Sequence, residues 1–339
     1  MTTEKQAAQS APSASPPQPS PLLLERFDSP FSVGTPGARW AFFSVGPVPF
    51  NDGLAQTSPD GLWLVPPGRN PRTGEPAYSL SQVPEKSADE VPGQFDHCKW
   101  LVFSTHKAST GLPGFDAVRG EELAFEAWMT GRTFGTKAHP FGPAVRNPEE
   151  DFRLATFGQN TIDVETGMVF DFLFTNEQIY ALYERLPFAR TPQNPYAAFT
   201  YAIPLARRTP EAVHHVKIAY DRAAGTVRWE LEGKEVFRVD KLGRSLDSRW
   251  LIGDHGGQEQ DVELRQLNVG FGLFSLLDCF LEGRGLVRLS GQPDFYVLPP
   301  AKPGQAAGFA DEQSHASNRL FGQGAELRMR QCNVSSTPR

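Results

Sequence analysis

The chain has 339 residues, of which 39% are hydrophobic and 21% charged, which is enough apolar material for a sizeable core. Its 33 basic and 39 acidic side chains give a net charge of −6, and no basic run favours nucleic acid or a membrane as a partner. The three cysteines are too few and too scattered for a disulfide framework or a zinc site, so we expect no metal and no cofactor.

The chain divides into a short tail and one folded part. Residues 1–21 are rich in Ala, Ser, Pro and Gln and lack the apolar stretch of a signal peptide, so we expect a disordered tail and a cytoplasmic location. Residues 22–339 are expected to form a single β-sandwich domain. Two stretches rich in Pro, Gly and polar residues, about 66–95 and 299–323, are predicted to be long loops. The sequence carries no signal for an oligomeric state.

Short stretches in which apolar and polar residues alternate recur along the folded part, with turn residues between them. No stretch keeps a helical period over three turns, although short helical pieces could occur near 272–281. We therefore predict an all-β fold built from antiparallel strands. The predicted strands are 39–45, 62–65, 99–105, 122–132, 153–157, 161–175, 178–186, 198–205, 213–221, 226–231, 234–239, 261–274, 286–290 and 326–334.

The most specific segment is 213–237, where three predicted strands are joined by two tight turns. Gly233 lies in the second turn, at a position that suits a positive φ. This segment resembles the hairpins of concanavalin-A-like lectins and laminarinase-like glucanases. Residues 25–28, 122–128 and 324–330 are similar to the opening, inner and last strands of that superfamily.

The resemblance covers most of the chain beyond residue 22. It implies a two-sheet antiparallel β-sandwich (a jelly roll) with a ligand on the hollow face of one sheet. The whole chain is also similar to a bacterial family of uncharacterised function with this fold. Such sandwiches host lectins, hydrolases and lyases, so the resemblance specifies the fold more than the function.

Laminarinase-like hydrolases carry Glu-x-Asp-x-x-Glu on one strand, and the nearest match here is 161–166. Asp163 matches the central Asp, but threonines occupy both glutamate positions, so the resemblance does not imply the retaining glycosidase mechanism. Asp163 and Glu165 would share a strand face about 7 Å apart, which could make a carboxylate pair. The alternative is a solvated strand end or a calcium or turn contact.

Asp171 is the only charged residue in the apolar stretch 168–174, and it faces away from Phe172. A carboxylate on an apolar face needs a partner, and Arg185 or Tyr183 on the next predicted strand could supply one. Asp171 is therefore either half of a core ion pair or a pocket acid with a raised pKa.

Three further groups could bind or react. Glu126 and Trp128 share a face of one strand, which is the composition of a sugar platform and equally of a solvated surface. His97, near Trp100, and His106 flank another strand and could transfer protons or be structural.

The leading hypothesis is a cytosolic enzyme of specialised small-molecule metabolism that acts by acid/base chemistry on a largely apolar ligand. Cyclisation, isomerisation, hydration and hydrolysis all fit this chemistry. The alternatives are a carbohydrate-binding or degenerate glycoside-hydrolase-like module, and a non-catalytic binding protein. The candidate catalytic residues are Asp171, Glu126, His97, Asp163 and Glu165, and the candidate ligand-binding residues are Trp128, Tyr183, Arg185, Trp100, Phe172 and His106.

Overall fold

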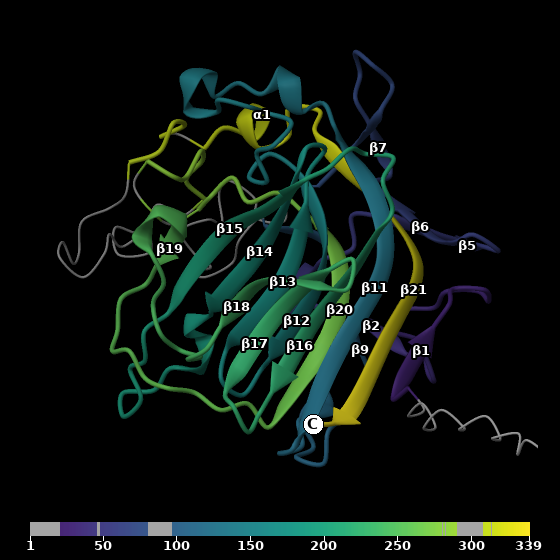
Figure 1. Cartoon of the computed structure of the whole chain (residues 1–339). Helices are drawn as coiled ribbons and strands as arrows, with labels where there is room; N and C mark the ends of the chain where they lie inside the picture. The colour runs from purple at the N-terminus through teal and green to yellow at the C-terminus, as the bar shows by residue number, and fades with distance from the viewer. Residues whose placement is uncertain are drawn as a thin grey trace, which may run out of the picture.

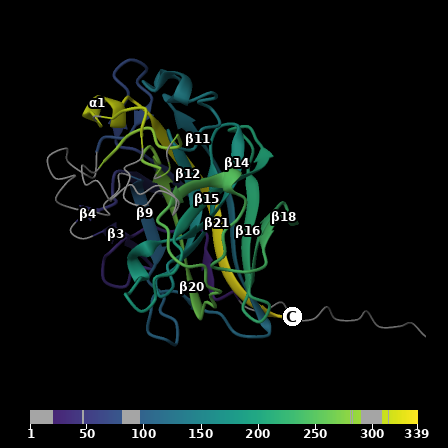
Figure 2. The same cartoon turned by 90° about the vertical axis from the view of Figure 1, so that its left-hand side faces the viewer.

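The computed structural model describes residues 21–45, 48–80, 97–279, 281, 283–289, 308–312 and 314–339. The predicted two-sheet antiparallel β-sandwich is confirmed. Sheet A has the strand order β18-β17-β16-β11-β21-β6-β5, with β1 beside β21, and sheet B has the order β19-β15-β14-β13-β12-β20-β9-β2, with β10 beside β20. Figure 2 shows the two layers, with β16 and β18 of sheet A toward one side and β9 of sheet B toward the other.

The strands of sheet A are β1 (Leu23–Glu25), β5 (Leu54–Ser58), β6 (Gly61–Val65), β11 (Glu121–Phe134), β16 (His214–Asp221), β17 (Thr226–Leu231), β18 (Lys234–Val239) and β21 (Gly324–Pro338). Those of sheet B are β2 (Trp40–Phe42), β9 (Cys98–Ser104), β10 (Phe115–Asp116), β12 (Thr156–Asp163), β13 (Met168–Phe174), β14 (Gln178–Arg185), β15 (Phe199–Arg207), β19 (Leu251–Asp254) and β20 (Gln266–Phe274).

Smaller elements lie outside the two sheets. Two short strand pairs join β3 (Ser44–Val45) to β4 (Val48–Pro49) and β7 (Gly68–Arg69) to β8 (Pro76–Ala77). The helical turns are η2 (Thr136–Ala138), η3 (Gly142–Ala144), η4 (Pro187–Ala189), η5 (Ser248–Trp250) and α1 (Ala316–Arg319).

The long strands β11 and β21 run side by side through the middle of sheet A (Figure 1). Their register extends from Glu121 opposite Pro338 to Phe134 opposite Gly324, with one irregularity between Trp128 and Met129. Because the last strand pairs with both β11 and β1, it connects the middle of the chain with its beginning.

The main core lies between the inner faces of the sheets, where aromatic side chains from both layers meet. Phe170, Phe172 and Phe174 of β13 are fully buried there, and Phe170 packs edge-on against Trp229 of sheet A with ring centroids 5.9 Å apart. Alternate residues of β13 must point to the other face of sheet B, because side chains alternate along a strand. Asp171 therefore leaves the core.

The stretches 161–175 and 286–290 are among the predicted strands that differ from the structure. The stretch 161–175 is two strands, β12 and β13, because Gly167 takes a positive φ of 76° and closes a turn onto the Asp163 carbonyl. Over 286–289 the chain forms only an isolated bridge between Val287 and Asp311, and residue 290 lies outside the described residues.

The predicted helical pieces near 272–281 are also wrong for the residues that the structure describes. β20 continues to Phe274, where the strand is paired on both sides and its side chains fill the two apolar layers. The tail 1–20 and parts of the two predicted loops, 81–96, 299–307 and 313, lie outside the described residues. Within the described ranges, none of the helices has the length and apolarity needed to cross a membrane.

The core interpretation makes a stability prediction. Phe172→Ala should lower the free energy of unfolding by about 3–5 kcal/mol, because it leaves a cavity in a fully buried aromatic layer. Val236→Ala, at a side chain 38% exposed on the edge strand β18, should change it by less than about 0.5 kcal/mol. Urea unfolding of both variants would measure this, and equal losses would contradict the assignment of the core.

Candidate active site

The outer face of sheet B, which points away from the main core, is itself a largely buried apolar layer. Phe43 and Phe50, beside the β3–β4 pair, and Phe152 pack on it. Its own apolar side chains include Leu101, Ile162, Val169, Leu173, Leu182, Ala202, Ile252 and Phe274. Polar side chains interrupt this layer on four neighbouring strands. They are Asn160 of β12, Asp171 of β13, Glu184 of β14 and Thr200 of β15.

Asp171 is 4% exposed and is held from three directions. Its carboxylate accepts hydrogen bonds from Asn160 Nδ2 at 2.8 Å and from the Thr161 amide at 3.0 Å. From the core side, Trp229 Nε1 donates to the Asp171 backbone carbonyl at 2.9 Å. Burial nevertheless raises the pKa of Asp171 well above its usual value, because the two hydrogen bonds offset only part of the cost of charging a buried carboxyl.

Glu184 lies diagonally across from Asp171 on the next strand. Val169 pairs with Glu184 and Asp171 with Leu182, so the two acids are about 7–8 Å apart on the same face. Glu184 is half-buried and accepts a hydrogen bond from Thr200 Oγ1 at 2.5 Å. Burial raises the pKa of Glu184, whereas the Thr200 hydrogen bond and the charge of His97 oppose that rise.

His97 and Asp278 complete the cluster from outside the four strands. The His97 carbonyl accepts from the Ser275 amide at 2.8 Å, which holds the start of β9 beside the segment that follows β20. His97 Nδ1 lies 2.6 Å from Asp278 Oδ1, and the two side chains are 20% and 1% exposed. The buried Asp278 carboxylate therefore holds the Nδ1 side of the His97 ring in place by its charge. We call Asp171, Glu184, His97 and Asp278 the sheet B cluster.

The pKa values of two neighbouring side chains, Cys98 and His255, respond to the charges of the cluster. Burial raises the pKa of the Cys98 thiol, and the charges of Glu184, Asp171 and Asp278 raise it further, so Cys98 stays protonated and is a poor nucleophile. Burial, Arg190 and His97 together lower the pKa of His255 to about 4, so that imidazole is neutral at neutral pH.

The sheet B cluster can donate and accept protons. Burial raises the pKa of Glu184, which favours its protonated form and lets it give a proton to a leaving group. His97, oriented by Asp278, can take a proton from a substrate or a water. No group of three or more metal-binding side chains occurs within the described part of the chain.

The structure brings together only two of the predicted catalytic residues, Asp171 and His97. Asp163 closes the β12–β13 turn, where its buried carboxylate accepts from Thr166 Oγ1 and Gln266 Nε2, each at 2.6 Å. Glu165 lies beyond the end of β12 and pairs with Arg265 at the surface. The contacts of Asp163 and Glu165 are therefore those of a turn and of a surface ion pair, rather than those of a carboxylate pair.

Glu126 and Trp128 lie on the outer face of sheet A and both contact His215. Glu126 Oε1 is 3.2 Å from His215 Nε2, and the Trp128 and His215 rings stack with centroids 4.2 Å apart. This second acid–histidine pair is separated from the sheet B cluster by the whole sandwich.

Tyr183 and Arg185, the expected partners of Asp171, lie on the opposite face of sheet B. Tyr183 points into the main core and its hydroxyl accepts from the Gly243 amide at 2.8 Å. Arg185 stacks on the Tyr196 ring, 3.8 Å from its centroid. Both have the opposite parity to Glu184 on β14, so neither contacts Asp171.

Three of the predicted ligand-binding residues also lie away from the cluster. Trp100 and Phe172 are buried in the main core, and His106 is an exposed residue stacked on Phe115. The sequence interpretation missed Glu184, Asp278, Asn160 and Thr200. Side chains alternate along β14, so Glu184 points to the face opposite to Arg185, and this alternation could have identified Glu184. No sequence signal links Asp278 to His97.

Comparison with known proteins gives a family and a fold. Residues 24–338 match the model of a family of unknown function (DUF6081). The uncharacterized protein L829 of Acanthamoeba polyphaga mimivirus is 30% identical over 248 residues. That alignment covers 56% of this chain and 56% of the viral protein, so the match spans little more than half the length of this relative.

Several solved sandwiches are similar in fold at low identity. An endo-1,3-β-glucanase from Streptomyces sioyaensis is 13% identical with a TM-score of 0.47, covering 97% of this chain and 100% of that one. The Crh5 transglycosylase is 10% identical with a TM-score of 0.40, covering 92% and 83%. The alginate lyase A1-II' is 8% identical with a TM-score of 0.34, covering 71% and 72%.

The burial of Asp171 makes a pH prediction. The native state holds the Asp171 proton above the pH of about 3.9 at which the unfolded chain releases it. Raising the pH through this window therefore destabilises the wild type, and Asp171→Asn, which cannot ionise, should escape that loss. Urea unfolding from pH 4 to pH 8 should show the variant gaining stability relative to the wild type.

Asp240→Asn is the matched control, because the Asp240 side chain is 71% exposed. Its stability should stay parallel to that of the wild type over the same range. Parallel curves for Asp171→Asn as well would contradict a raised pKa at Asp171.

Proposed function

We propose that this chain, which belongs to the family of unknown function DUF6081, is an enzyme that cleaves a saccharide by proton transfer at the sheet B cluster. Glu184 is the general acid and His97, oriented by Asp278, is the general base. Asp171, almost completely buried, positions the site through Asn160 rather than touching the substrate.

The proposal rests on one observation: an acid whose protonated form is favoured, Glu184, and a base, His97, influence each other electrostatically. Burial raises the pKa of a half-buried Glu184, and the charge of His97 acts on the same carboxyl. Environments that favour the protonated acid beside an oriented base are the usual arrangement of acid–base catalysis. In an ordinary structural ion pair, the Glu184 carboxylate would contact His97 directly. Here the carboxylate that contacts His97 is that of Asp278.

The substrate class follows from the polar groups around these two residues. Thr200, Glu184 and Asn160 carry polar side chains on the same face of sheet B, and such hydrogen-bonding groups suit a hydroxyl-rich ligand. Asn160 is buried, and its Oδ1 has no hydrogen-bond partner within the described structure. A ligand hydroxyl can donate to such an oxygen, whereas an apolar ligand would leave it unsatisfied at a cost of about 1–3 kcal/mol.

One observation favours the second candidate, a small-molecule enzyme with a largely apolar substrate. Most of the outer face of sheet B is apolar, with Leu182, Ala202 and Phe274 around the cluster. The acid and base would keep the same roles, so the two candidates differ only in the substrate that is turned over.

The test is turnover of a panel of neutral and uronic-acid oligosaccharides, with products identified by mass spectrometry. We expect activity on at least one linkage, with a bell-shaped pH dependence of kcat/KM. Glu184→Gln and His97→Gln should each lower kcat by about 10²–10⁴-fold, because each removes one proton-transfer group.

The second acid–histidine pair provides matched controls. Glu126→Gln and His215→Gln, on the outer face of sheet A, should leave kcat unchanged. Failure of the wild type to turn over the whole panel would refute the saccharide proposal. Equal losses at the two pairs would refute the assignment of the site.

A further inference from the structure

A cavity lies where the chain crosses from sheet A to sheet B, far from the sheet B cluster. Glu25 ends β1, and Trp40 begins β2, which pairs with β9 opposite Ser104. His97 precedes the other end of β9, so the length of that strand, about 20 Å, separates the two places. The cavity measures about 130 Å³, more than a single water needs. Its lining consists of Glu25, Ser29, Pro30, Phe31, Ser32, Gly37, Arg39 and Trp40.

The charged wall of this cavity is built and held in place. Glu25 is 5% exposed, and its carboxylate accepts from the Phe27 amide at 3.2 Å and from Trp40 Nε1 at 3.3 Å. Arg39 Nη2 lies 2.9 Å from the same carboxylate, and Arg39 Nη1 donates to the Leu24 carbonyl at 3.1 Å. The Arg39 side chain is 52% exposed and is also part of the cavity lining.

The turn that carries these residues is strained. Phe27 takes a φ of 55°, a left-handed conformation that a bulky residue rarely adopts. Its ring is buried against Phe271 with centroids 5.8 Å apart, and its amide is held by Glu25. Strain of this kind, of the order of 1–3 kcal/mol, persists where the surroundings hold a site in one shape.

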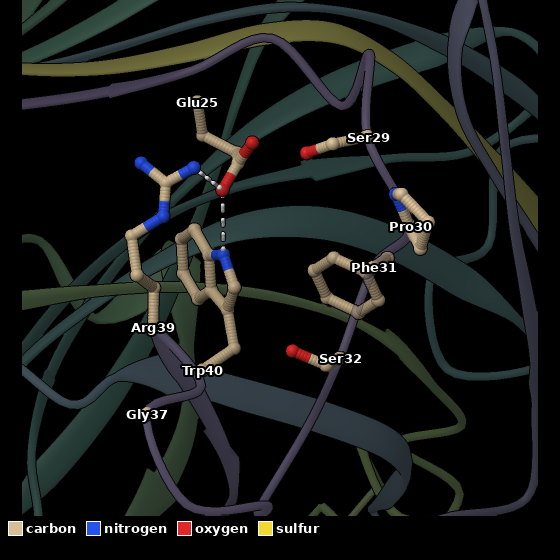
Figure 3. A pocket seen from close by; sticks show the side chains of 8 residues that line it. All are labelled: Glu25, Ser29, Pro30, Phe31, Ser32, Gly37, Arg39 and Trp40. Atoms are coloured by element: carbon tan, nitrogen blue, oxygen red, sulfur yellow. Dashed lines mark hydrogen bonds and ion pairs between the residues drawn. The ribbon is translucent and has the colours of Figure 1, made fainter.

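The opposite wall is polar and aromatic. Figure 3 shows the hydroxyls of Ser29 and Ser32 and the ring of Phe31 facing Glu25 and Trp40 across the cavity. Hydroxyls, a carboxylate, a guanidinium and an aromatic ring can together bind a ring that carries several hydroxyl groups. Because Arg39 balances the charge of Glu25, neither a free anion nor a free cation gains a strong net attraction there.

We propose that this cavity binds one ring of a neutral sugar or polyol, at a site separate from the sheet B cluster. Oε1 of Glu25 accepts a hydrogen bond from one ligand hydroxyl, Arg39 donates to others, and Phe31 packs against the ring. The proposal does not depend on catalysis by Glu184 and His97.

The experiment is a titration of the full chain with methyl β-glucopyranoside, followed by the indole N–H signal of Trp40 in a nitrogen-15 NMR spectrum. We expect saturable shifts with a dissociation constant in the millimolar range. Ser32→Phe, which fills the cavity from an exposed position, should weaken binding at least tenfold. Ser248→Phe, an exposed serine in η5, and Glu184→Gln should leave it unchanged.

Inorganic phosphate and glycine serve as the anionic and zwitterionic probes, and we expect them to bind more weakly than the glycoside. Tighter binding of either one would overturn the proposed ligand class. An unchanged Trp40 signal in the wild type, or undiminished binding in Ser32→Phe, would overturn the site. Loss of binding in Glu184→Gln alone would place the ligand at the sheet B cluster instead.

Discussion

Both faces of β12, β13 and β14 are covered, and the structure of the candidate active site depends on this constraint. A sheet with one wet face can leave polar side chains to water, but a sheet buried on both sides must satisfy them from within. The inner face of β13 carries apolar side chains such as Phe172 and has no polar group to satisfy. On the outer face, Asp171 is satisfied by Asn160 and Glu184 by Thr200, each on an adjacent strand. The strand register therefore determines which acid meets which partner.

The two acid–histidine pairs of this protein differ in environment rather than in chemistry. Glu126 and His215 are each 25% exposed and belong to a face that also carries Lys217 and other charged residues. Water and neighbouring charges screen such a pair, so it behaves as an ordinary surface ion pair and contributes little to stability. The charge of His97 instead acts on Glu184, whose carboxyl lies on a largely apolar layer, where a change in charge has a larger effect on the neighbouring groups. Burial therefore distinguishes the candidate active site from the surface pair.

Period-two alternation predicted antiparallel strands and the direction of most side chains, and the resemblance to concanavalin-A-like proteins implied the two-sheet sandwich. It placed Asp171 on the face opposite Phe172, which the structure confirms. It could not identify Asp278, because the contact with His97 joins residues far apart in the sequence through a segment with no periodicity. The expected contact between Asp171 and Arg185 was wrong because the strand parity of Arg185 puts it on the other face. The direction of side chains along one strand was thus predictable, whereas the register between two strands and the contacts made by loops were not.

The carboxyls of the sheet B cluster are hard to explain as contributions to stability. Burial raises the pKa of both Asp171 and Glu184, which means that each carboxyl makes the folded state less favourable once it ionises. Apolar residues of similar volume in such positions are often neutral or stabilising. The layer around Asp171 and Glu184 consists largely of Leu, Ile, Val and Phe side chains, so residues of these types would continue it at the two positions. An acid–base reaction of the kind proposed above would give these two carboxyls a role that stability does not.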